Sequence, residues 1–568
     1  MENSKQLANS FKAIGSLIGI SKASSQTIRT KQLVKVDYLC LFLVCISAGY
    51  LTTLQGFAAL PINADSLAPF EEAKSLISNP DTHLFNIHVS RIASIFPDLT
   101  TTILLQQIHP QAGFLEIFSH YAWFCSSLFL LLATVLTHTI NSKQNTLTAV
   151  SIKISLATII LLNISLQFNI VYAHLITPVH HGGNILNTIL ILILSINTIK
   201  SQNKNIMILG MSLLTVLATM SNKISIFSAV IPSIIIFITF LKRSQKRNYS
   251  ISLILATAAG VFIGSRFNEQ CATPQFNLLG TLSALSQYFQ ASWITSASAI
   301  LSIVSIIYAI KSNQSSLDFP IQTKAGLLTI SLSSLSYFVY LPMLTSSGEA
   351  PIRYICIAYA LIPVFFVIYL NRIKNHQQSI ALSTMLVITL VSFQGTGRNN
   401  INITKLQSLK DTLIQRSERI LPFKNDAAKF INEMGYNAYL GLGNYWISGA
   451  TLATNSKIHV IPIHYTGFPD FWGATPQDVR LQIKSLDQEK TYLLTEDDEF
   501  KQNFEEEFGP AVKTWNYNKT ERAFTLEPIQ TSQRIQIYTN PSIFKRVRKH
   551  SIDFKRQCNP SLPNYSER

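Results

Sequence analysis

Acidic side chains gather in one segment of the sequence, residues 61–113, which lies between two long apolar runs. The segment holds five of the 11 acidic residues in 1–395, namely Asp65, Glu71, Glu72, Asp81 and Asp98. Carboxylates held at a membrane surface can act as a base or hold a metal for a headgroup substrate. Helix capping is the alternative, because Asp65 and Ser66 precede Pro69 and Glu71 as N-cap residues do. Arg91 lies in the same segment.

Two further polar segments interrupt the apolar sequence. His180 and His181 precede two glycines, and this tight turn suits a phosphate or sugar contact or a structural role alone. Adjacent histidine side chains diverge, so the pair is a poor metal site by itself. Arg353 and Tyr354 stand before a later apolar run, where a guanidinium can bind a phosphate through two hydrogen bonds. An ordinary interfacial anchor made by these two residues is the alternative.

The composition of the chain requires a membrane setting for these segments. Of its 568 residues, 48% are hydrophobic and 13% charged, against roughly 25% charged in soluble domains. Six cysteines, 22 glycines and 21 prolines exclude disulfide-scaffold, collagen-like and disordered classes. The sequence therefore predicts a polytopic all-α bundle of about eleven spans. The apolar runs are 36–60, 114–140, 148–168, 184–199, 206–221, 224–241, 250–266, 290–310, 325–345, 354–370 and 379–395.

The distribution of charge predicts how the bundle is oriented. Residues 1–395 contain 23 Lys and Arg, and these concentrate in alternate short connections, most densely at 242–247. The positive-inside rule places those connections and the segment 1–35 in the cytoplasm. An odd number of spans then places residues 396–568 outside. The formal charge of +16 thus has a topological meaning and does not indicate nucleic acid.

Residues 396–568 are predicted to form an α/β domain that ends in a basic tail at 545–556. Helical stretches at 426–434, 445–453 and 497–508 alternate with apolar runs at 438–442, 458–463, 491–494, 523–526 and 534–538. This alternation favours a small, partly parallel sheet. The segment contains no glycine-rich nucleotide loop, zinc motif or nucleophile elbow. In the segment 61–113, the periodicity predicts two helices along the membrane surface, 66–78 and 85–105.

This organisation resembles the integral-membrane glycosyltransferases of the C-type fold, which use polyprenyl-phosphate-linked sugars. The resemblance rests on the N-in bundle, the long first outer loop 61–113 with Asp65 just after the first span, and the outer C-terminal domain. It implies a bacterial inner-membrane enzyme that passes a sugar to a lipid, glycan or protein acceptor. Asp65 would be the catalytic base and Arg353 would hold the donor phosphate. Glu71, Glu72, Arg91, His180, His181 and Tyr354 would line the substrate site. No organic cofactor is expected, and a divalent metal stays an open alternative.

Two other classes remain compatible with the sequence. A transporter or flippase of a lipid-linked precursor would carry ionisable residues in the middle of its spans, and few besides Lys153 and His174 occur there. An assembly or sensor protein would use the bundle only as an anchor, for which one span suffices. The sequence favours the transferase over both.

Overall fold

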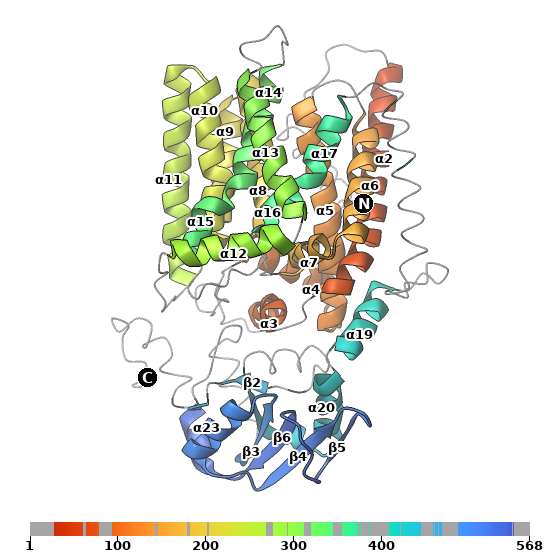
Figure 1. Ribbon diagram of the computed structural model, residues 1–568, viewed down its shortest axis with the longest axis vertical. Coiled ribbons are helices and arrows are strands. Elements are labelled where there is room, and N and C mark those ends of the chain that lie inside the picture. The colour runs from red at the N-terminus through yellow and green to blue at the C-terminus, as the bar shows by residue number, and fades with distance from the viewer. Residues whose placement is uncertain are drawn as a thin grey trace.

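The computed structural model describes most of the bundle and most of the C-terminal domain. Its described residues are 28–60, 64–78, 94–141, 146–178, 182–201, 204–267, 277–291, 293–311, 320–344, 355–372, 408–420, 422–444, 460–463, 465–467 and 487–547, with single residues at 377, 384, 458 and 549. The chain is a multi-pass membrane protein in which a helical bundle stands beside a sheet domain (Figure 1). The predicted fold class is confirmed.

Ten apolar passes make up the described part of the bundle. Eight helical stretches are long and apolar enough to cross a membrane, and two shorter ones cover 226–240 and 356–370. These ten coincide with the first ten predicted runs, and the eleventh, 379–395, lies outside the described residues. The passes are α2 (Ile28–Gly56), α5 (Phe114–Asn141), α6 (Leu147–Ile164), α8 (Gly182–Lys200), α9 (Lys204–Ser221), η4 with α10 (Ile226–Val230, Ile231–Phe240), α11 (Arg243–Phe267), α13 (Trp293–Lys311), α14 with α15 (Ile321–Leu335, Tyr337–Leu344) and α16 with α17 (Cys356–Ala360, Ile362–Leu370).

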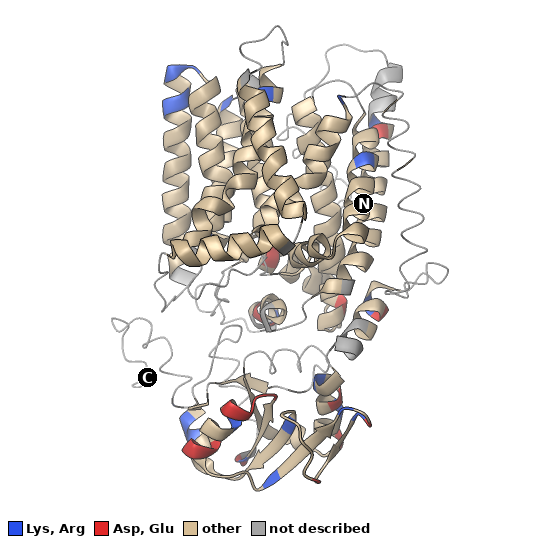
Figure 2. Cartoon of the chain, in the orientation of Figure 1, with Lys and Arg blue, Asp and Glu red and all other residues tan. Residues whose placement is uncertain are grey.

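Lys and Arg collect at the end of the bundle that points away from the sheet domain (Figure 2). Hydrogen bonds join neighbouring helices there. Thr148 Oγ1 donates to Asp37 Oδ1 at 2.6 Å, and Thr323 Oγ1 donates to the Ile140 carbonyl at 2.6 Å. We call this the basic end, and the opposite end, which faces the sheet domain, the sheet end. The cations of the basic end are Lys35, Lys204, Lys242, Arg243, Lys246, Arg247, Lys324 and Arg372.

After α17 the chain passes once more from the basic end of the bundle to the sheet end. Asn371, just beyond α17, accepts a hydrogen bond from Lys153 Nζ near the start of α6, at the basic end. Helix α19 (Leu409–Ile420) lies at the sheet end, where Lys410 Nζ is 2.8 Å from Glu116 Oε2 at the start of α5. The described residues on either side of 379–395 therefore lie at opposite ends of the bundle, as the predicted eleventh span requires.

Short helices cover the sheet end. Helix α3 (Ala64–Ser78) runs across the bundle axis and is viewed end-on in Figure 1, and α12 (Leu278–Ala291) also lies across it. The expected helix over 66–78 is therefore present. The second expected helix, 85–105, is not continuous, because Ser94 is left-handed (φ 37°) and Phe96 is extended. A single turn, η3 (Ile95–Leu99), and α4 (Thr100–Ile108) follow, while 85–93 lies outside the described residues.

A pair of glycines on α11 brings this helix against α9. A Cβ atom built on Gly260 would lie 2.6 Å from the Val216 carbonyl oxygen, and one on Gly264 would lie 2.6 Å from that of Met220. Small residues four apart allow two backbones to approach inside a membrane, where apolar lipid tails supply no hydrophobic drive for association. The Gly260-x-x-x-Gly264 spacing thus fixes the α9–α11 contact.

The sheet has the order β2-β1-β3-β6-β4-β5, with β2, β1 and β3 parallel and the rest antiparallel. Alternating residues of β3 face two cores. Tyr492 and Leu494 pack with α20 (Pro422–Glu433), whereas Leu493 packs with α23 (Asp498–Phe508) and with helical residues 541–547. The first part of the expected basic tail therefore belongs to the domain core. The strands are β1 (Tyr439–Gly443), β2 (Val460–Pro462), β3 (Asp487–Thr495), β4 (Lys513–Asn518), β5 (Ala523–Thr525) and β6 (Arg534–Tyr538).

We expect Gly260→Leu to loosen the bundle, because the new side chain would overlap the α9 backbone. Overpacking of this kind costs about 1–3 kcal/mol or more. The measurement is the thermal unfolding temperature of the purified protein in detergent. Ala259→Leu is the matched control, since Ala259 is the exposed neighbour on the same helix. Equal unfolding temperatures for the two variants would contradict the proposed contact.

Candidate functional site

A turn of the first loop brings Asp98 into the bundle at the sheet end. Asp98 lies in η3 and is 2% exposed. The turn is fixed to two spans through the backbone of Phe96. The Phe96 amide donates to Ser221 Oγ of α9 at 2.9 Å, and Asn187 Nδ2 of α8 donates to the Phe96 carbonyl at 3.0 Å. The turn that carries the Asp98 carboxyl group is therefore fixed to α8 and α9.

The Asp98 carboxylate has a short contact with α5 and lies against the start of α8. Tyr121 OH donates to Asp98 Oδ1 at 2.5 Å, and the tyrosine is 1% exposed. A Cβ on Gly183 would lie 2.6 Å from Asp98 Oδ1, so only glycine fits there without a shift. Because α8 begins at Gly182, the carboxylate lies near the positive end of the helix dipole. Both features offset the cost of burying the carboxyl group.

This contact joins two segments that the sequence marked separately. Gly182 and Gly183 follow His180 and His181 directly, and these glycines lie next to the acid-rich first loop. The structure therefore places the backbone of Gly183, which follows the second polar segment, against the Asp98 side chain. His180 and His181 themselves lie outside the described residues.

Helix α3 carries the other predicted carboxylates of the first loop. Asp65 is in its first turn, Glu71 is partly buried and Glu72 is 1% exposed. Two contacts hold the helix across the bundle. Gln106 Nε2 of α4 donates to the Phe70 carbonyl at 2.9 Å, and the rings of Phe70 and Phe114 meet edge to face at 5.5 Å. The positions of all three acids are therefore set by packing against α4 and α5.

The predicted cations of the site lie outside the described residues. Arg91 does so, as do Arg353 and Tyr354, which immediately precede Ile355, a residue with 0% exposure. Helix α16 packs on α7 (Leu166–Leu175), which in turn packs on η1 (Phe57–Ala59) at the end of the first span. The expected sharing of one space by Asp65 and Arg353 stays a prediction.

A second polar group connects the bundle to the start of the C-terminal domain. The Lys410–Glu116 ion pair joins α19 to α5, and the rings of His109 and His120 stack nearby with centroids 5.1 Å apart. The side chains of Lys410 and Glu116 are 48% and 33% exposed, so their pair is worth under about 1 kcal/mol. In the described part of the chain, no group of three or more His, Cys, Asp or Glu is arranged to hold a metal.

Sequence reasoning counted Asp98 among the loop acids but missed its pairing with Tyr121. A tyrosine inside an apolar span was the available signal, because a buried phenol needs a hydrogen-bond partner. Chemically, the sheet end combines an anchored, buried carboxyl group with three more acids on α3, which runs across this end of the bundle. Such an end can take up a proton and can orient a polar substrate, while Asp98 acts as a positioning group.

The fold matches that of ArnT from Cupriavidus metallidurans, whose crystal structure in the apo state superposes with a TM-score of 0.52. The match covers 90% of this chain and 99% of ArnT at 9% sequence identity. ArnT bound to undecaprenyl phosphate superposes with a TM-score of 0.49, at 7% identity, over 89% of this chain and 98% of that one. No protein-family model and no curated protein sequence matches the chain. The likeness shows the fold, which is the C-type glycosyltransferase fold expected from the sequence.

We expect Tyr121→Phe to destabilise the bundle, because it leaves the buried Asp98 carboxylate with one donor fewer. Losing a hydrogen bond to a buried charged group costs about 1.5–3 kcal/mol. Tyr337→Phe is the matched control, since Tyr337 is also 1% exposed but its hydroxyl has no hydrogen-bond partner. Unfolding temperatures in detergent should fall for the first variant and not for the second. A similar fall in both would show that the Asp98 bond is unimportant.

Proposed function

We propose that the protein is a membrane glycosyltransferase that moves a sugar from a polyprenyl-phosphate donor to an acceptor at the sheet end. The observation that carries this proposal is the fold it shares with ArnT over nearly the whole of both chains. The clustering of carboxylates at one end of the bundle agrees with it. Asp65, Glu71, Glu72 and Asp98 all belong to elements that lie at that end.

The proposed reaction is an inverting displacement at the anomeric carbon of the donor sugar. The acceptor hydroxyl oxygen forms the new glycosidic bond, and the bond from the sugar to the lipid phosphate breaks. Asp65 takes the hydroxyl proton, and the electron pair of the broken bond leaves with the phosphate. Arg353, with Arg91, stabilises that phosphate by charge-assisted hydrogen bonds. No cofactor enters this scheme.

Other residues complete the proposed site. Glu71 and Glu72 follow Asp65 by about two turns of α3 and would bind sugar hydroxyls. His180 and His181 would contact the substrate beside the Asp98 turn, and Tyr354 would pack on the sugar next to Arg353. Holding a divalent metal remains an alternative role for the acids of α3.

The proposed orientation places the sheet end outside the cytoplasm of a bacterial inner membrane. Its support is the concentration of cations at the basic end, from Lys35 on α2 to Arg372 after α17 (Figure 2). Lys and Arg flanking spans stay on the cytoplasmic side during insertion. The donor lipid would then react at the outer face of the inner membrane.

The transporter alternative is weaker in the described structure. Lys153 is buried in α6 and donates to Asn371 Oδ1 at 2.5 Å, close to the basic end. Asp98 lies at the other end. The described residues thus provide no series of ionisable groups across the bundle of the kind a proton relay requires.

Cysteine labelling tests the orientation. In a background without the six native cysteines, Lys519→Cys in the sheet domain should react with a membrane-impermeant maleimide in intact spheroplasts. Lys246→Cys at the basic end should react only after permeabilisation, because its side of the bundle is cytoplasmic. The reverse pattern would overturn both the orientation and the proposed reaction side.

Asp65→Asn should lower sugar transfer by about 10²–10⁴-fold, because the amide keeps the size of the side chain but cannot accept the proton. The assay follows radiolabelled sugar from polyprenyl-phosphate donors into the membrane fraction. Asp411→Asn is the matched control, since Asp411 is an exposed acid on α19 at the same end. Transfer that persists in Asp65→Asn would exclude Asp65 as the base and direct attention to Glu71 and Glu72.

A further inference from the structure

Five cations gather at one corner of the basic end, where α9 begins and where α10 passes into α11. Helix α10 ends at Phe240 and α11 begins at Arg243, so only two residues connect them. Figure 2 shows the start of α11 in blue. We call this group the cationic corner, and its members are Lys204, Lys242, Arg243, Lys246 and Arg247.

No acidic residue of the neighbouring helices balances the charge of the cationic corner. The sequence contains no Asp or Glu between Glu116 and Glu269, so no helix from α6 to α11 carries one. In the described part of the chain, no ion pair involves a member of the corner. The positive-inside rule counts Lys and Arg and gives acids little weight, so it does not account for this absence.

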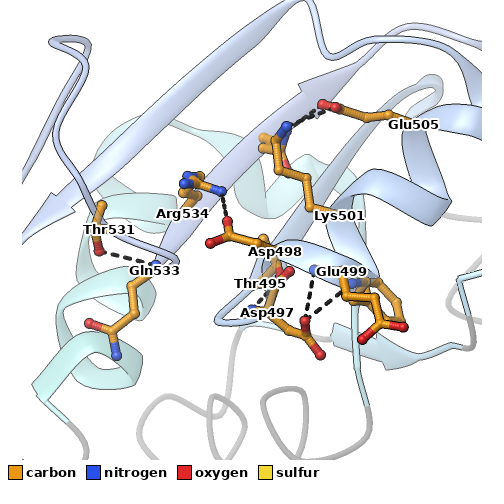
Figure 3. Close-up of polar contacts among 11 residues, drawn as sticks. Thr495, Asp497, Asp498, Glu499, Lys501, Glu505, Thr531, Gln533 and Arg534 are labelled. Atoms are coloured by element: carbon orange, nitrogen blue, oxygen red, sulfur yellow. Dashed lines mark hydrogen bonds and ion pairs between the residues drawn. The ribbon is translucent and has the colours of Figure 1, made fainter.

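Cations of the sheet domain are arranged differently. Arg534 pairs with Asp498 there, and Lys501 Nζ is 2.8 Å from Glu505 Oε2 (Figure 3). These pairs neutralise charge within the domain itself. The cationic corner instead keeps an excess of positive charge, which attracts an anion from outside the chain.

Two parallel helices hold the corner in place. Lys204 is the first residue of α9, and its Nζ donates to Gln245 Oε1 in the first turn of α11 at 3.1 Å. Farther along, Gly260 of α11 packs on Val216 of α9, so both helices start at the basic end and run together. Each presents the positive end of its dipole at the corner, and helix N-termini bind phosphate groups.

Exposed apolar side chains continue from the corner along α9. Leu209 and Leu213 are 71% and 62% exposed. They lie seven and three residues before Val216, so they share the face of α9 that meets Gly260 of α11. On α11 itself, Leu255 is 64% exposed. An apolar surface suited to hydrocarbon chains therefore begins about one to two turns below the cations.

We propose that the cationic corner binds the phosphate of an anionic phospholipid, whose acyl chains run along the exposed leucines of α9. Lys and Arg bind phosphate through charge-assisted hydrogen bonds, and clusters of them at the end of a span attract anionic lipids. The apolar surface below the corner favours a lipid over a free phosphate ion. The proposal is independent of the proposed function, because neither Asp65 nor the sheet end enters it.

Native mass spectrometry of the full-length protein in detergent tests the proposal. The probe is phosphatidylglycerol, and the control lipid is phosphatidylethanolamine with the same acyl chains, whose ammonium group cancels the phosphate charge. The wild type should bind phosphatidylglycerol about tenfold more tightly, because the cations act on its net charge. Equal affinities for the two lipids would overturn the proposal.

Substitutions assign the binding to the corner. Lys242→Gln with Arg243→Gln should weaken phosphatidylglycerol binding about 30-fold, which corresponds to about 1 kcal/mol for each cation. Lys242→Arg with Arg243→Lys keeps the charge and should keep the binding. The matched control is Lys35→Gln with Lys519→Gln, which removes two exposed cations outside the corner. An equal loss in the corner variant and the control would contradict the assignment.

Photocrosslinking of the wild type decides the question if the corner variant fails to accumulate. Phosphatidylglycerol with a diazirine in an acyl chain should label α9 near Leu209 and Leu213, or the first turns of α11. Labelling confined to other helices would overturn the proposal. Inorganic phosphate in excess, at matched ionic strength, should not lower the labelling. Displacement of the lipid by phosphate would show that the corner is a site for a free anion instead.

Discussion

The Asp98 carboxylate connects three parts of the chain that are distant in sequence. It belongs to the first loop, accepts from Tyr121 on α5 and lies against Gly183 at the start of α8. A carboxyl group buried inside a protein is stable only when hydrogen-bond donors or positive dipoles surround it, so these three segments must stay together. Their assembly fixes where α4 and α3 lie, since both pack on the same turn. The arrangement of the acids on α3 therefore depends on a group that need not touch substrate.

Much of the architecture could be predicted from sequence because membrane spans depend on simple physical requirements. Runs of apolar residues had to become helices, since lipid offers no partner to backbone N–H and C=O groups. The predicted boundaries agree with the structure to within a few residues for α5 and α9. The run 148–168 instead divides at Ser165, whose side chain accepts from the Phe168 amide and starts α7 as a new helix. Such local capping competes with the continuous pattern and is hard to foresee.

Other features could not be predicted because they depend on contacts between distant residues. Strand β4, with the sequence Lys-Thr-Trp-Asn-Tyr-Asn, has too few apolar residues to be recognised, and it forms because β5 and β6 pair with it. The proposed helix over 85–105 had a good amphipathic pattern, but Phe96 is held extended by Ser221 and Asn187. For the site, the sequence predicted a helix over 66–78 that carries Glu71 and Glu72 and begins next to Asp65, and α3 carries all three residues. Only the tertiary structure joined the glycines after His181 to the first loop.

The attachment of the sheet domain has a mechanical consequence. Helix α19 inserts Leu409 and Leu413, 6% and 0% exposed, into the core of the bundle, and a single position, 421, separates it from α20. The domain therefore begins close to the place where α19 docks on the bundle. A tilt of about 10° would move the far end of α20, ~18 Å away by 1.5 Å per residue, through about 3 Å. Lys424 lies in the first turn of α20 and would move by a small fraction of this. For any given tilt, the part of the domain nearest the bundle therefore moves less than the far edge.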